Sequence, residues 1–255
     1  MTKVFENYSK YYDLFYKDKD YLKETKFLLQ VIKKYKLIGK DILSLGCGTA
    51  TYEILLANKG FNIVGLDLSR KMLNIGHKKV DDLKLNNKIK LILQDVRKIT
   101  LPKKFDTVMC MFNVIGYQNS NSDLELMLSG VSKHLKKGGL FLFDLWHAPA
   151  VIADKPQNRV REIEVDGRKI IRNTESKFHP TKDLIEIRFT VSEISSGKHK
   201  VRTREVHTMR YFSLPETSYF LKKAGLELVG GFNFPDIKST ISDDKWDIFI
   251  VAKKK

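Results

Sequence analysis

The fold is decided by Asp41-Ile42-Leu43-Ser44-Leu45-Gly46-Cys47-Gly48-Thr49-Ala50, a short apolar run that ends in two closely spaced glycines. The apolar residues 42–45 are typical of a buried parallel strand. Gly46 and Gly48 predict a tight turn after this strand, because a residue without a side chain adopts left-handed conformations and leaves the backbone open. The stretch therefore predicts a site where the main chain contacts a ligand.

The next residues complete a unit of strand, turn, helix and strand. Apolar residues recur at helical spacing over residues 49–58, and residues 61–66 are apolar again. Asp67 closes this second strand within Gly65-Leu66-Asp67-Leu68-Ser69. A carboxylate there can accept hydrogen bonds from both ribose hydroxyls of an adenosine that lies across the strand ends. The unit therefore predicts a nucleotide-type cofactor site.

Composition limits the class of protein. The chain has 255 residues, of which 42% are hydrophobic, and Gly and Pro are sparse, as in one large α/β domain or one domain with an insertion. No apolar run approaches the roughly 18 residues of a membrane span, and the first residues lack the apolar stretch of a signal peptide. We expect no membrane span and a cytoplasmic location. Cys47 and Cys110 have no metal-ligand spacing, so we expect neither a metal site nor a disulfide.

The chain is basic, with 46 Lys and Arg against 30 Asp and Glu and a net charge of +16. Such a charge suits nucleic acid, an anionic small molecule or an anionic membrane surface. The lysines are spread along the whole chain, which favours solvated helix faces. Zinc-finger spacing, the aromatic signature of RNA-binding domains and a helix-turn-helix pattern are all missing from the sequence. We therefore expect an anionic small-molecule partner and no nucleic acid.

Strands alternate with helices through the first 146 residues. The further predicted strands cover residues 89–93, 105–112 and 140–146, and the predicted helices cover residues 23–35, 70–79 and 123–135. Ser69 is the expected N-cap of the second of these helices. Lys136-Lys137-Gly138-Gly139 should end the third, because glycine adopts the left-handed C-cap at low cost. This alternation predicts a doubly wound, parallel α/β sheet with its ligand outside the carboxyl ends of the strands.

The pattern changes at about residue 159. β-branched and aromatic residues then alternate with charges as far as residue 211, with turn signals such as Asp166-Gly167 and Ser196-Gly197. We expect three or four antiparallel strands here. Helical spacing resumes over residues 216–224, and residues 226–229 and 246–252 are predicted to be the last two strands of the main sheet.

Three regions follow from this order of elements. We expect a helical arm or lid at residues 1–38, a cofactor-binding domain at residues 39–150 and 212–255, and an antiparallel β insertion at residues 151–211. The insertion should lie beside the cofactor and form the substrate or oligomer region. Its edge strands offer a surface for a homodimer.

The glycine turn lacks the third glycine of a redox dinucleotide site, which weakens an NAD interpretation. Taken together, the strand ends instead resemble the class I S-adenosylmethionine-dependent methyltransferases. The stretches that carry this resemblance are Leu43 to Ala50, Gly65 to Ser69 with Met72, Gln94-Asp95-Val96, Phe105-Asp106-Thr107-Val108 and Leu135 to Gly139. The resemblance implies a seven-stranded, Rossmann-like methyltransferase sheet, S-adenosylmethionine as cofactor and S-adenosylhomocysteine as product.

The same resemblance implies roles for individual residues. The backbone of Gly46, Cys47 and Gly48 would face the methionine part of the cofactor, and Asp67 would hold the ribose. The remaining implied contacts are Leu68 and Met72 beside the adenine, Asp95 at its amino group, the Val96 amide at its ring nitrogen, and Met111, Phe112 and Asn113 near the sulfonium. The family commonly has an acidic residue in place of Ser44 and a glycine in place of Ala50. An acidic contact to the cofactor's amino group therefore stays open.

A narrower resemblance covers the whole chain. The tyrosine-rich stretch Tyr11 to Tyr16, the stretch Met111 to Tyr117 and the insertion are similar to methyltransferases that dimethylate the amino group of nucleotide-linked deoxy-amino sugars. Relatives of this group methylate other small molecules. The resemblance implies that aromatic residues lie at the methyl transfer site, namely Tyr12, Tyr16, Tyr21 and Tyr117. Tyr12 and Tyr21 are also expected among the residues that bind the cofactor.

Methyl transfer from a sulfonium requires mainly that the nucleophile is held in line, about 3 Å from the methyl carbon. An amine must also be uncharged when it attacks, so a group that orients it or takes its proton helps. His147, directly after the fifth strand, is our acid/base candidate, with Tyr117 and Tyr12 beside it; a packing role for His147 stays open. Guanidinium groups suit a diphosphate, and the candidates are Arg159, Arg161, Arg202, Arg204 and Arg210.

We therefore expect an enzyme that N-methylates a nucleotide- or phosphate-linked amino sugar in glycan biosynthesis. Two alternatives stay open. One is O-methylation of a phosphorylated or surface-glycan precursor. The other is a non-catalytic protein that binds S-adenosylmethionine for regulation.

Overall fold

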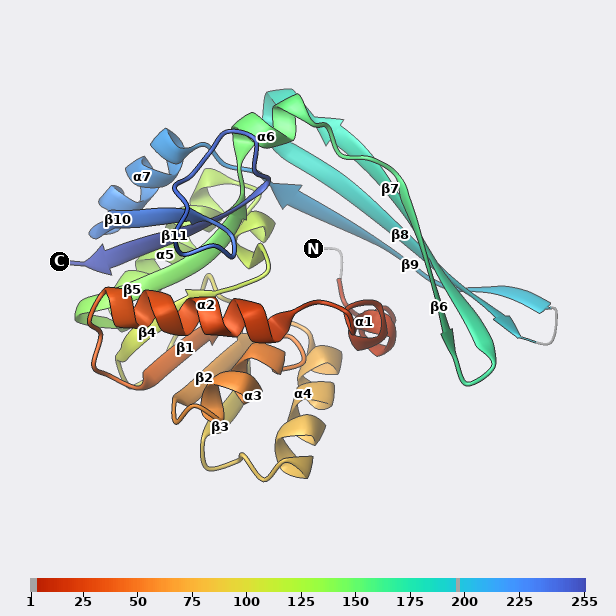
Figure 1. Ribbon diagram of the computed structural model, residues 1–255, viewed down its shortest axis with the longest axis horizontal. Helices are drawn as coiled ribbons and strands as arrows, with labels where there is room; N and C mark the ends of the chain where they lie inside the picture. Colours follow the sequence, from red (N-terminus) through yellow and green to blue (C-terminus); the bar gives the residue numbers. More distant parts are fainter. Residues whose placement is uncertain (1–3, 196–197) are drawn as a thin grey trace.

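The computed structural model describes residues 4–195 and 198–255, which form an α/β domain with a long sheet projecting from it (Figure 1). The strands of the main sheet are β1 (Asp41–Leu45), β2 (Asn62–Asp67), β3 (Ile89–Leu93), β4 (Phe105–Cys110), β5 (Leu135–Trp146), β10 (Leu226–Asn233) and β11 (Asp247–Lys254). Their order is β10-β11-β5-β4-β1-β2-β3. β1 to β5 pair in parallel, whereas β11 runs antiparallel to both β5 and β10. The predicted seven-stranded sheet is confirmed, and it is mixed rather than wholly parallel.

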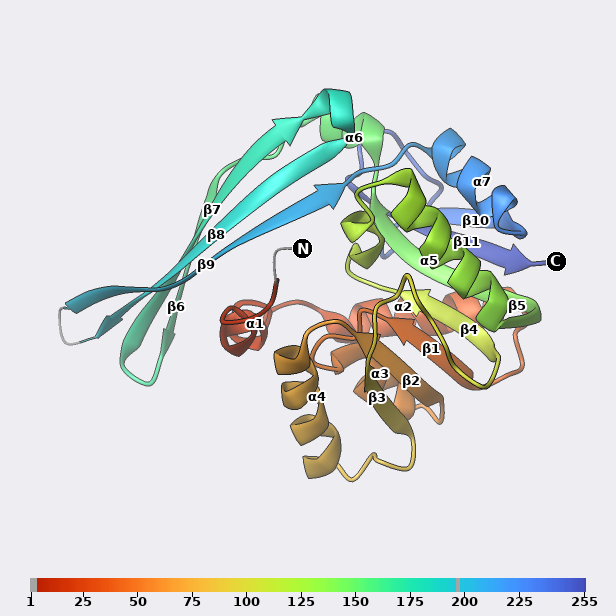
Figure 2. The same cartoon turned by 180° about the vertical axis from the view of Figure 1, so that it is seen from behind.

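Helices cover both faces of this sheet, as Figures 1 and 2 show. One face packs against α2 (Tyr21–Lys34), α3 (Thr51–Ala57) and α4 (Arg70–Asp82), and the other against α5 (Asn121–His134) and α7 (Leu214–Lys223). The predicted N-cap of α4 is confirmed, because the Ser69 side chain accepts a hydrogen bond from the Met72 amide. The doubly wound arrangement leaves the carboxyl ends of β1 to β5 uncovered by these helices.

The predicted glycine cap of α5 is wrong. The helix ends at His134, and β5 begins at Leu135. Gly138 and Gly139 lie inside β5 at a shift of its register with β4, and Gly138 has φ of +77°. A Cβ atom at Gly139 would lie 2.9 Å from the Asp106 carbonyl oxygen. The two glycines therefore allow a bulge in β5 at the point where its backbone lies close to that of β4.

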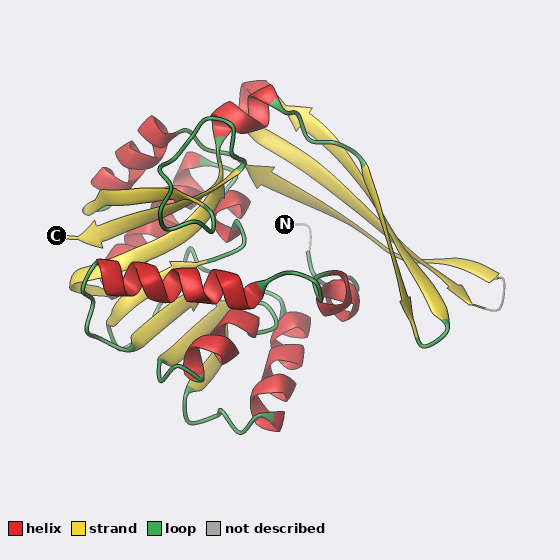
Figure 3. Ribbon diagram, in the orientation of Figure 1, coloured by secondary structure: helices red, strands yellow, loops and turns green. Residues whose placement is uncertain are grey.

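The insertion is a four-stranded antiparallel sheet in the order β6-β7-β8-β9. Its strands are β6 (Arg159–Val165), β7 (Arg168–His179), β8 (Leu184–Ser195) and β9 (Lys198–Arg210). Asp166 and Gly167 both have positive φ, which matches the two-residue hairpin turn that the sequence predicts between β6 and β7. The turn expected at Ser196-Gly197 lies outside the described residues. Figure 3 shows how far this sheet extends beyond the main domain.

The N-terminal segment contacts both sheets. α1 (Ser9–Phe15) lies between the projecting sheet and the start of α4 in both views of the fold (Figures 1 and 2). Tyr8, Tyr11 and Phe15 are buried in one apolar cluster with residues of β6, β7 and β8. α2 instead packs on the main sheet through Phe27, whose ring centroid lies 4.8 Å from that of Phe249. The smaller helices are η1 (Val114–Tyr117), α6 (Ala148–Ala153) and η2 (Pro180–Lys182).

Within residues 4–195 and 198–255, no helix combines the length and the apolar character needed to cross a membrane.

Replacing Phe249 should destabilise the attachment of α2 to the sheet. Its side chain is fully buried between Phe27 and Phe234, whose centroids lie 4.8 and 5.6 Å away. We expect Phe249→Ala to lower the free energy of unfolding by about 3–5 kcal/mol, because it removes buried apolar area and leaves a cavity. Urea denaturation followed by circular dichroism measures this change. Tyr219→Ala on the exposed face of α7 is the control, and equal transition midpoints for the two variants would contradict the prediction.

Candidate functional site

The glycine turn after β1 is held against β2 by the main chain. The amides of Gly46 and Cys47 both donate to the Leu66 carbonyl oxygen, at 2.8 and 3.0 Å. Gly46 and Gly48 have φ of +71° and +55°. A Cβ atom at Gly46 would lie 2.5 Å from the Val114 side chain. The sequence therefore needs glycine here for conformation and for space, and the turn leaves its backbone available to a ligand.

Asp67 at the end of β2 joins this turn to α4. Its Oδ2 accepts a hydrogen bond from the Gly48 amide and its Oδ1 from the Ser69 amide, both at 2.8 Å. Burial raises the pKa of this carboxyl group, and the two amides act against that shift. A carboxylate has about four acceptor positions, so both oxygens can still accept a ribose hydroxyl. The predicted ribose contact fits this geometry.

Leu68 and Met72 differ in exposure. Leu68 is 60% exposed, which is unusual for a large apolar side chain and leaves a surface that a planar base can cover. Met72 is buried beneath the turn, with its Cε atom 3.2 Å from the position of a Cβ at Gly48. The structure therefore places both residues beside the turn, Leu68 at the surface and Met72 as support.

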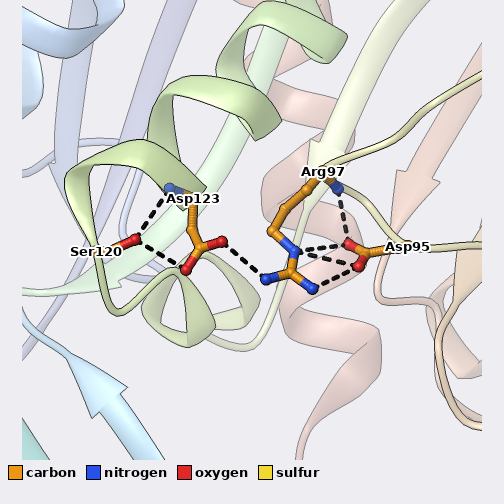
Figure 4. A network of polar contacts seen from close by, with 4 residues as sticks. All are labelled: Asp95, Arg97, Ser120 and Asp123. Atoms are coloured by element: carbon orange, nitrogen blue, oxygen red, sulfur yellow. Dashed lines mark hydrogen bonds and ion pairs between the residues drawn. The ribbon is translucent and has the colours of Figure 1, made fainter. Parts of the chain in front are cut away.

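Asp95 follows β3, and Arg97 holds its carboxylate. The Arg97 Nε lies 2.9 and 3.1 Å from the two carboxylate oxygens, and Nη2 lies 2.5 Å from one of them. Figure 4 shows the guanidinium between Asp95 and Asp123, which sits in the first turn of α5 behind Ser120. The Arg97 hydrogen bond lowers the pKa of Asp95. Asp95 is thus an oriented, ionised acceptor next to Val96, and the adenine contacts of both stay predictions.

The end of β4 is strained and tied to β5. Phe112 and Asn113 have φ of +66° and +52°, a conformation that costs roughly 1–3 kcal/mol for a residue with a side chain. The Asn113 amide donates to the buried Asp144 carboxylate at 2.8 Å. Burial raises the pKa of Asp144 to about 7. Asp144 therefore keeps this strained turn in place beside the buried Met111.

Buried polar atoms at this turn have no partner among the described residues. They are the side-chain nitrogen and oxygen of Asn113 and the Oδ1 atom of Asp144. Buried polar groups are normally hydrogen-bonded, so these atoms indicate room for a polar ligand group. The Phe112 ring suits a cation, because the Lys19 ammonium already lies 4.7 Å from its centroid. Together with the open glycine turn and Asp67, these residues fit S-adenosylmethionine.

The two departures from the family pattern, Ser44 and Ala50, have a structural explanation. Ser44 donates a hydrogen bond of 2.5 Å to Glu53, a buried residue of α3. Glu53 thus places a carboxyl group from the helix that follows the turn beside Ser44, and its Oε2 has no partner among the described residues. Ala50 has φ of +64°, the conformation that favours glycine. Sequence reasoning missed Glu53 because it lies on a helix rather than on the strand.

Aromatic side chains from three parts of the chain meet at the end of β4. We call Phe5, Tyr12, Tyr16, Phe112 and Tyr117 the aromatic site. Tyr16 lies 4.8 Å from Tyr12 and 5.0 Å from Phe112 between ring centroids. Phe5 lies 5.8 Å from Tyr12 and 6.1 Å from Tyr117. The structure thus brings the predicted Tyr12, Tyr16 and Tyr117 together. Burial raises the pKa of Tyr12 and Tyr117, so both stay protonated at neutral pH.

Tyr21 lies at the border of this cluster. Its ring centroid is 5.1 Å from that of Tyr52. The Tyr52 hydroxyl donates to Glu24, which also pairs with Lys19. Burial raises the pKa of Tyr21, and a hydrogen bond to Tyr12 lowers it. Tyr21 therefore connects the start of α2 with Tyr12.

The histidine of the aromatic site is His207, which the sequence reasoning missed. Its Nδ1 lies 2.8 Å from the Tyr117 hydroxyl, and its ring centroid lies 5.0 Å from that of Phe5. His147 lies at the end of β5, where its amide donates to the Trp246 carbonyl oxygen. Burial lowers the pKa of His147, and the nearby Asp243 acts to raise it. The His147 side chain is buried and its Nδ1 atom has no partner among the described residues, so its role in acid/base chemistry or packing stays a prediction.

A signal for His207 was present in the sequence. Alternation along β9 places His207 on the buried face with Glu205 and Thr203. Three polar residues on a buried strand face are uncommon, because burying polar groups costs free energy unless they are paired. Arg204 between Thr203 and Glu205 concealed this pattern, because the strand then reads as polar on both faces.

Most of the candidate phosphate-binding arginines have protein partners. Arg210 pairs with Glu216, Arg202 with Glu193 and Arg161 with Asp18. Arg159 and Arg204 are exposed on the insertion. Arg172, which the sequence reasoning did not single out, donates to the Tyr8 hydroxyl at 2.6 Å between the rings of Phe15, Tyr16 and Phe189.

The buried Glu53 should make stability depend on pH. Burial raises its pKa to about 7, so the folded state prefers the protonated acid, and this preference is lost as pH rises from the unfolded value to the folded value. Glu53→Gln stays neutral and should gain about 1–3 kcal/mol relative to the unchanged protein between pH 5 and pH 8. Urea denaturation across this range, with exposed Glu164→Gln as control, measures the difference. Parallel curves for Glu53→Gln and the unchanged protein would contradict the prediction.

Comparisons with known proteins identify the family of this chain. A family model described as a methyltransferase domain matches residues 42–139. The chain is 31% identical over 189 residues to YqeM of Bacillus subtilis, which carries the name of a methyltransferase, and the match covers 73% of each protein. It is 27% identical over 219 residues to the dTDP-3-amino-3,4,6-trideoxy-alpha-D-glucopyranose N,N-dimethyltransferase of Streptomyces venezuelae, covering 85% of this chain and 89% of that protein.

Solved structures share the fold. A crystal structure of an S-adenosylmethionine-dependent methyltransferase from Clostridium acetobutylicum has a TM-score of 0.80 and 23% identity, and covers 96% of each chain. DesVI from Streptomyces venezuelae has a TM-score of 0.79 and 24% identity, and covers 97% of this chain and 98% of its own. The chain therefore belongs to the S-adenosylmethionine-dependent methyltransferases, with S-adenosylmethionine as its cofactor.

Proposed function

We propose that the protein transfers methyl groups from S-adenosylmethionine to the amino group of a nucleotide-linked sugar used in glycan biosynthesis. The observation that carries this proposal is the aromatic site, where the N-terminal arm and η1 meet at the end of β4 beside His207 of the insertion. Side chains from separate regions meet at this place, which suits a small acceptor better than a folded RNA.

The names of relatives support an amino-sugar acceptor. Two further relatives are called dTDP-3-amino-3,6-dideoxy-alpha-D-glucopyranose N,N-dimethyltransferase, from Streptomyces fradiae, and dTDP-4-amino-2,3,4,6-tetradeoxy-D-glucose N,N-dimethyltransferase, from Saccharopolyspora spinosa. They are 25% and 21% identical to this chain. The named acceptors carry the amine on different sugar carbons, so the position of the amine is a separate question from the reaction.

The proposed roles follow the strand ends. Gly46, Cys47 and Gly48 hold the methionine part of the cofactor through their backbone, and Asp67 holds the ribose. The proposed adenine contacts are Leu68, Met72, Asp95 and Val96. The bound cofactor supplies an activated methyl group, and the protein supplies alignment and excludes water. Met111 and Phe112 line the transfer site, while Tyr12 and Tyr117 orient the acceptor amine through their hydroxyl groups.

The proposed division of the chain follows the same logic. The arm within residues 1–38 covers the cofactor, because Asp13 accepts from Thr49 at 2.7 Å and Phe5 accepts from Ser69 at 3.0 Å. Residues 39–150 and 212–255 bind the cofactor. Residues 151–211 bind the acceptor, and their exposed cations, such as Arg204, attract its phosphates.

Asp67 should control cofactor affinity. Asp67→Asn keeps the size of the side chain and removes one of its two acceptor oxygens. We expect S-adenosylmethionine and S-adenosylhomocysteine to bind roughly 10- to 100-fold more weakly, the effect of losing one or two hydrogen bonds to a charged group. Isothermal titration calorimetry measures the change, with exposed Asp81→Asn on α4 as the control. Unchanged affinity in Asp67→Asn would remove Asp67 from the site.

The acceptor proposal is tested by mass spectrometry after incubation with S-adenosylmethionine. We expect dTDP-3-amino-3,6-dideoxy-alpha-D-glucopyranose or a related amino sugar to gain one or two methyl groups. The matched sugar nucleotide with a hydroxyl in place of the amine is the control, and we expect no gain. Methylation of that hydroxyl would favour the O-methyltransferase alternative, and methylation of RNA would reject a small acceptor. Cofactor binding without turnover on any acceptor would indicate a regulatory protein.

A further inference from the structure

We propose that Tyr117, His207 and Glu205 form a proton relay that takes the proton from the acceptor amine, and that docking of the N-terminal arm completes this relay by holding Glu205. The proposal rests on the proposed transfer to an amine. It assigns a function to two buried residues of β9, a strand outside the cofactor-binding sheet.

The three side chains form a continuous line. The Tyr117 hydroxyl lies 2.8 Å from His207 Nδ1. On the other side of the ring, His207 Nε2 lies 3.6 Å from Glu205 Oε2, slightly beyond hydrogen-bond distance. His207 and Glu205 are 2% and 8% exposed. The two nitrogens of one imidazole thus face a phenol and a carboxylate, which lets the ring accept a proton on one side while a negative charge stabilises it on the other.

Of the three residues, Tyr117 is the one that we place next to the acceptor amine. Its ring is in the aromatic site, and burial, followed by the nearby Tyr16 and Asp67, raises its pKa. The short helix η1 that carries Tyr117 packs on the cofactor turn, because a Cβ atom at Gly46 would lie 2.5 Å from the Val114 side chain. An amine aligned with the methyl group at this site therefore has the Tyr117 hydroxyl as a neighbour that can accept its hydrogen.

The arm holds the opposite end. Glu205 accepts hydrogen bonds from the amides of Phe5 and Tyr8, at 2.7 and 3.0 Å. Burial acts to raise the pKa of Glu205, but His207 and these two amides lower it overall, so the group remains charged. The arm reaches this carboxylate from the opposite end of the sequence. Arm docking and the charge that supports His207 are therefore coupled through one side chain.

The proposed step is balanced. The amine nitrogen forms a bond to the methyl carbon as the carbon–sulfur bond breaks, which leaves a neutral thioether and a positive nitrogen. That nitrogen gives a proton to the Tyr117 oxygen, while the hydroxyl proton of Tyr117 passes to His207 Nδ1. The resulting imidazolium carries its other proton on Nε2, towards Glu205. The positive charge has then moved from the cofactor to a buried ion pair, which releases its proton to solvent when the arm opens.

The relay also explains how an amine enters the reaction in its neutral form. Ordinary alkyl amines are mostly protonated at neutral pH, and a protonated amine has no lone pair for attack. The same three groups can take this first proton before the transfer. An acceptor whose amine is already neutral needs the relay less. A loss of kcat that depends on the amine pKa therefore distinguishes a relay from a packing role.

The test compares two acceptors in two variants. His207→Asn keeps an acceptor near Nδ1 but cannot take a proton, and Tyr117→Phe keeps the ring and removes the hydroxyl. With dTDP-3-amino-3,6-dideoxy-alpha-D-glucopyranose we expect kcat to fall about 100-fold in each, the usual contribution of a general base. With an analogue whose amine pKa is lowered by fluorine on the neighbouring carbon, we expect a loss several-fold smaller. His134→Asn, at a buried histidine of α5, is the control and should change kcat by the same factor with both acceptors.

The outcomes separate the relay from the proposed function. Equal losses on both acceptors in His207→Asn would overturn the relay while leaving amine methylation intact. No product from the unchanged protein with either amine would overturn the proposed acceptor instead.

The arm half of the proposal has its own measurement. Glu205→Gln offers one acceptor oxygen where the carboxylate offers two, so amide hydrogen exchange at Phe5 or Tyr8 should become about 10-fold faster. His207→Asn should leave these rates nearly unchanged. Unchanged exchange in Glu205→Gln would show that the carboxylate does not hold the arm.

Discussion

Two amide hydrogen bonds to the Asp67 carboxylate join the parts from which the cofactor site is built. The Gly48 amide belongs to the turn after β1, and the Ser69 amide belongs to the start of α4. Asp67 itself ends β2, so one side chain fixes the relative positions of two strand ends and a helix. A buried carboxylate without such donors would be costly. The glycine turn can keep its left-handed backbone because this carboxylate, together with the Leu66 carbonyl, defines where its amides point.

The same arrangement recurs at the other places that matter for function. Asp144 accepts from the amide of the strained Asn113 at the end of β4. Glu205 accepts from two amides of the arm. In each case a buried acid binds main-chain donors of a segment that has no regular hydrogen bonds of its own at that point. The cofactor turn, the turn near the sulfonium position and the lid are therefore fixed by three carboxylates rather than by apolar packing alone.

The sequence predicted the parts of the site that depend on local pattern. Apolar periodicity predicted the order of strands and helices. Asp67 followed from its position at a strand end and Asp95 from the family resemblance, and the cofactor contacts of both stay predictions. The errors came from tertiary contacts. Gly138 and Gly139 serve a bulge between β4 and β5 rather than a helix cap, because only the paired strands show how closely the chains approach. Glu53 contacts Ser44 from the following helix, and His207 contacts Tyr117 across 90 residues. Neither pairing has a local signal.

The hydrogen bond between the Phe5 amide and Glu205 joins residues that lie 200 positions apart in the sequence. Long-range contacts of this kind form late, because closing the large loop between the two residues costs conformational entropy. During synthesis the arm emerges first, and its contact with Glu205 must wait until β9 has been made. The cofactor strands can therefore fold while the tyrosines of the arm are still exposed to solvent. The aromatic site is thus complete only after β9 has been made, although its tyrosines Tyr12 and Tyr16 belong to the segment that was made first.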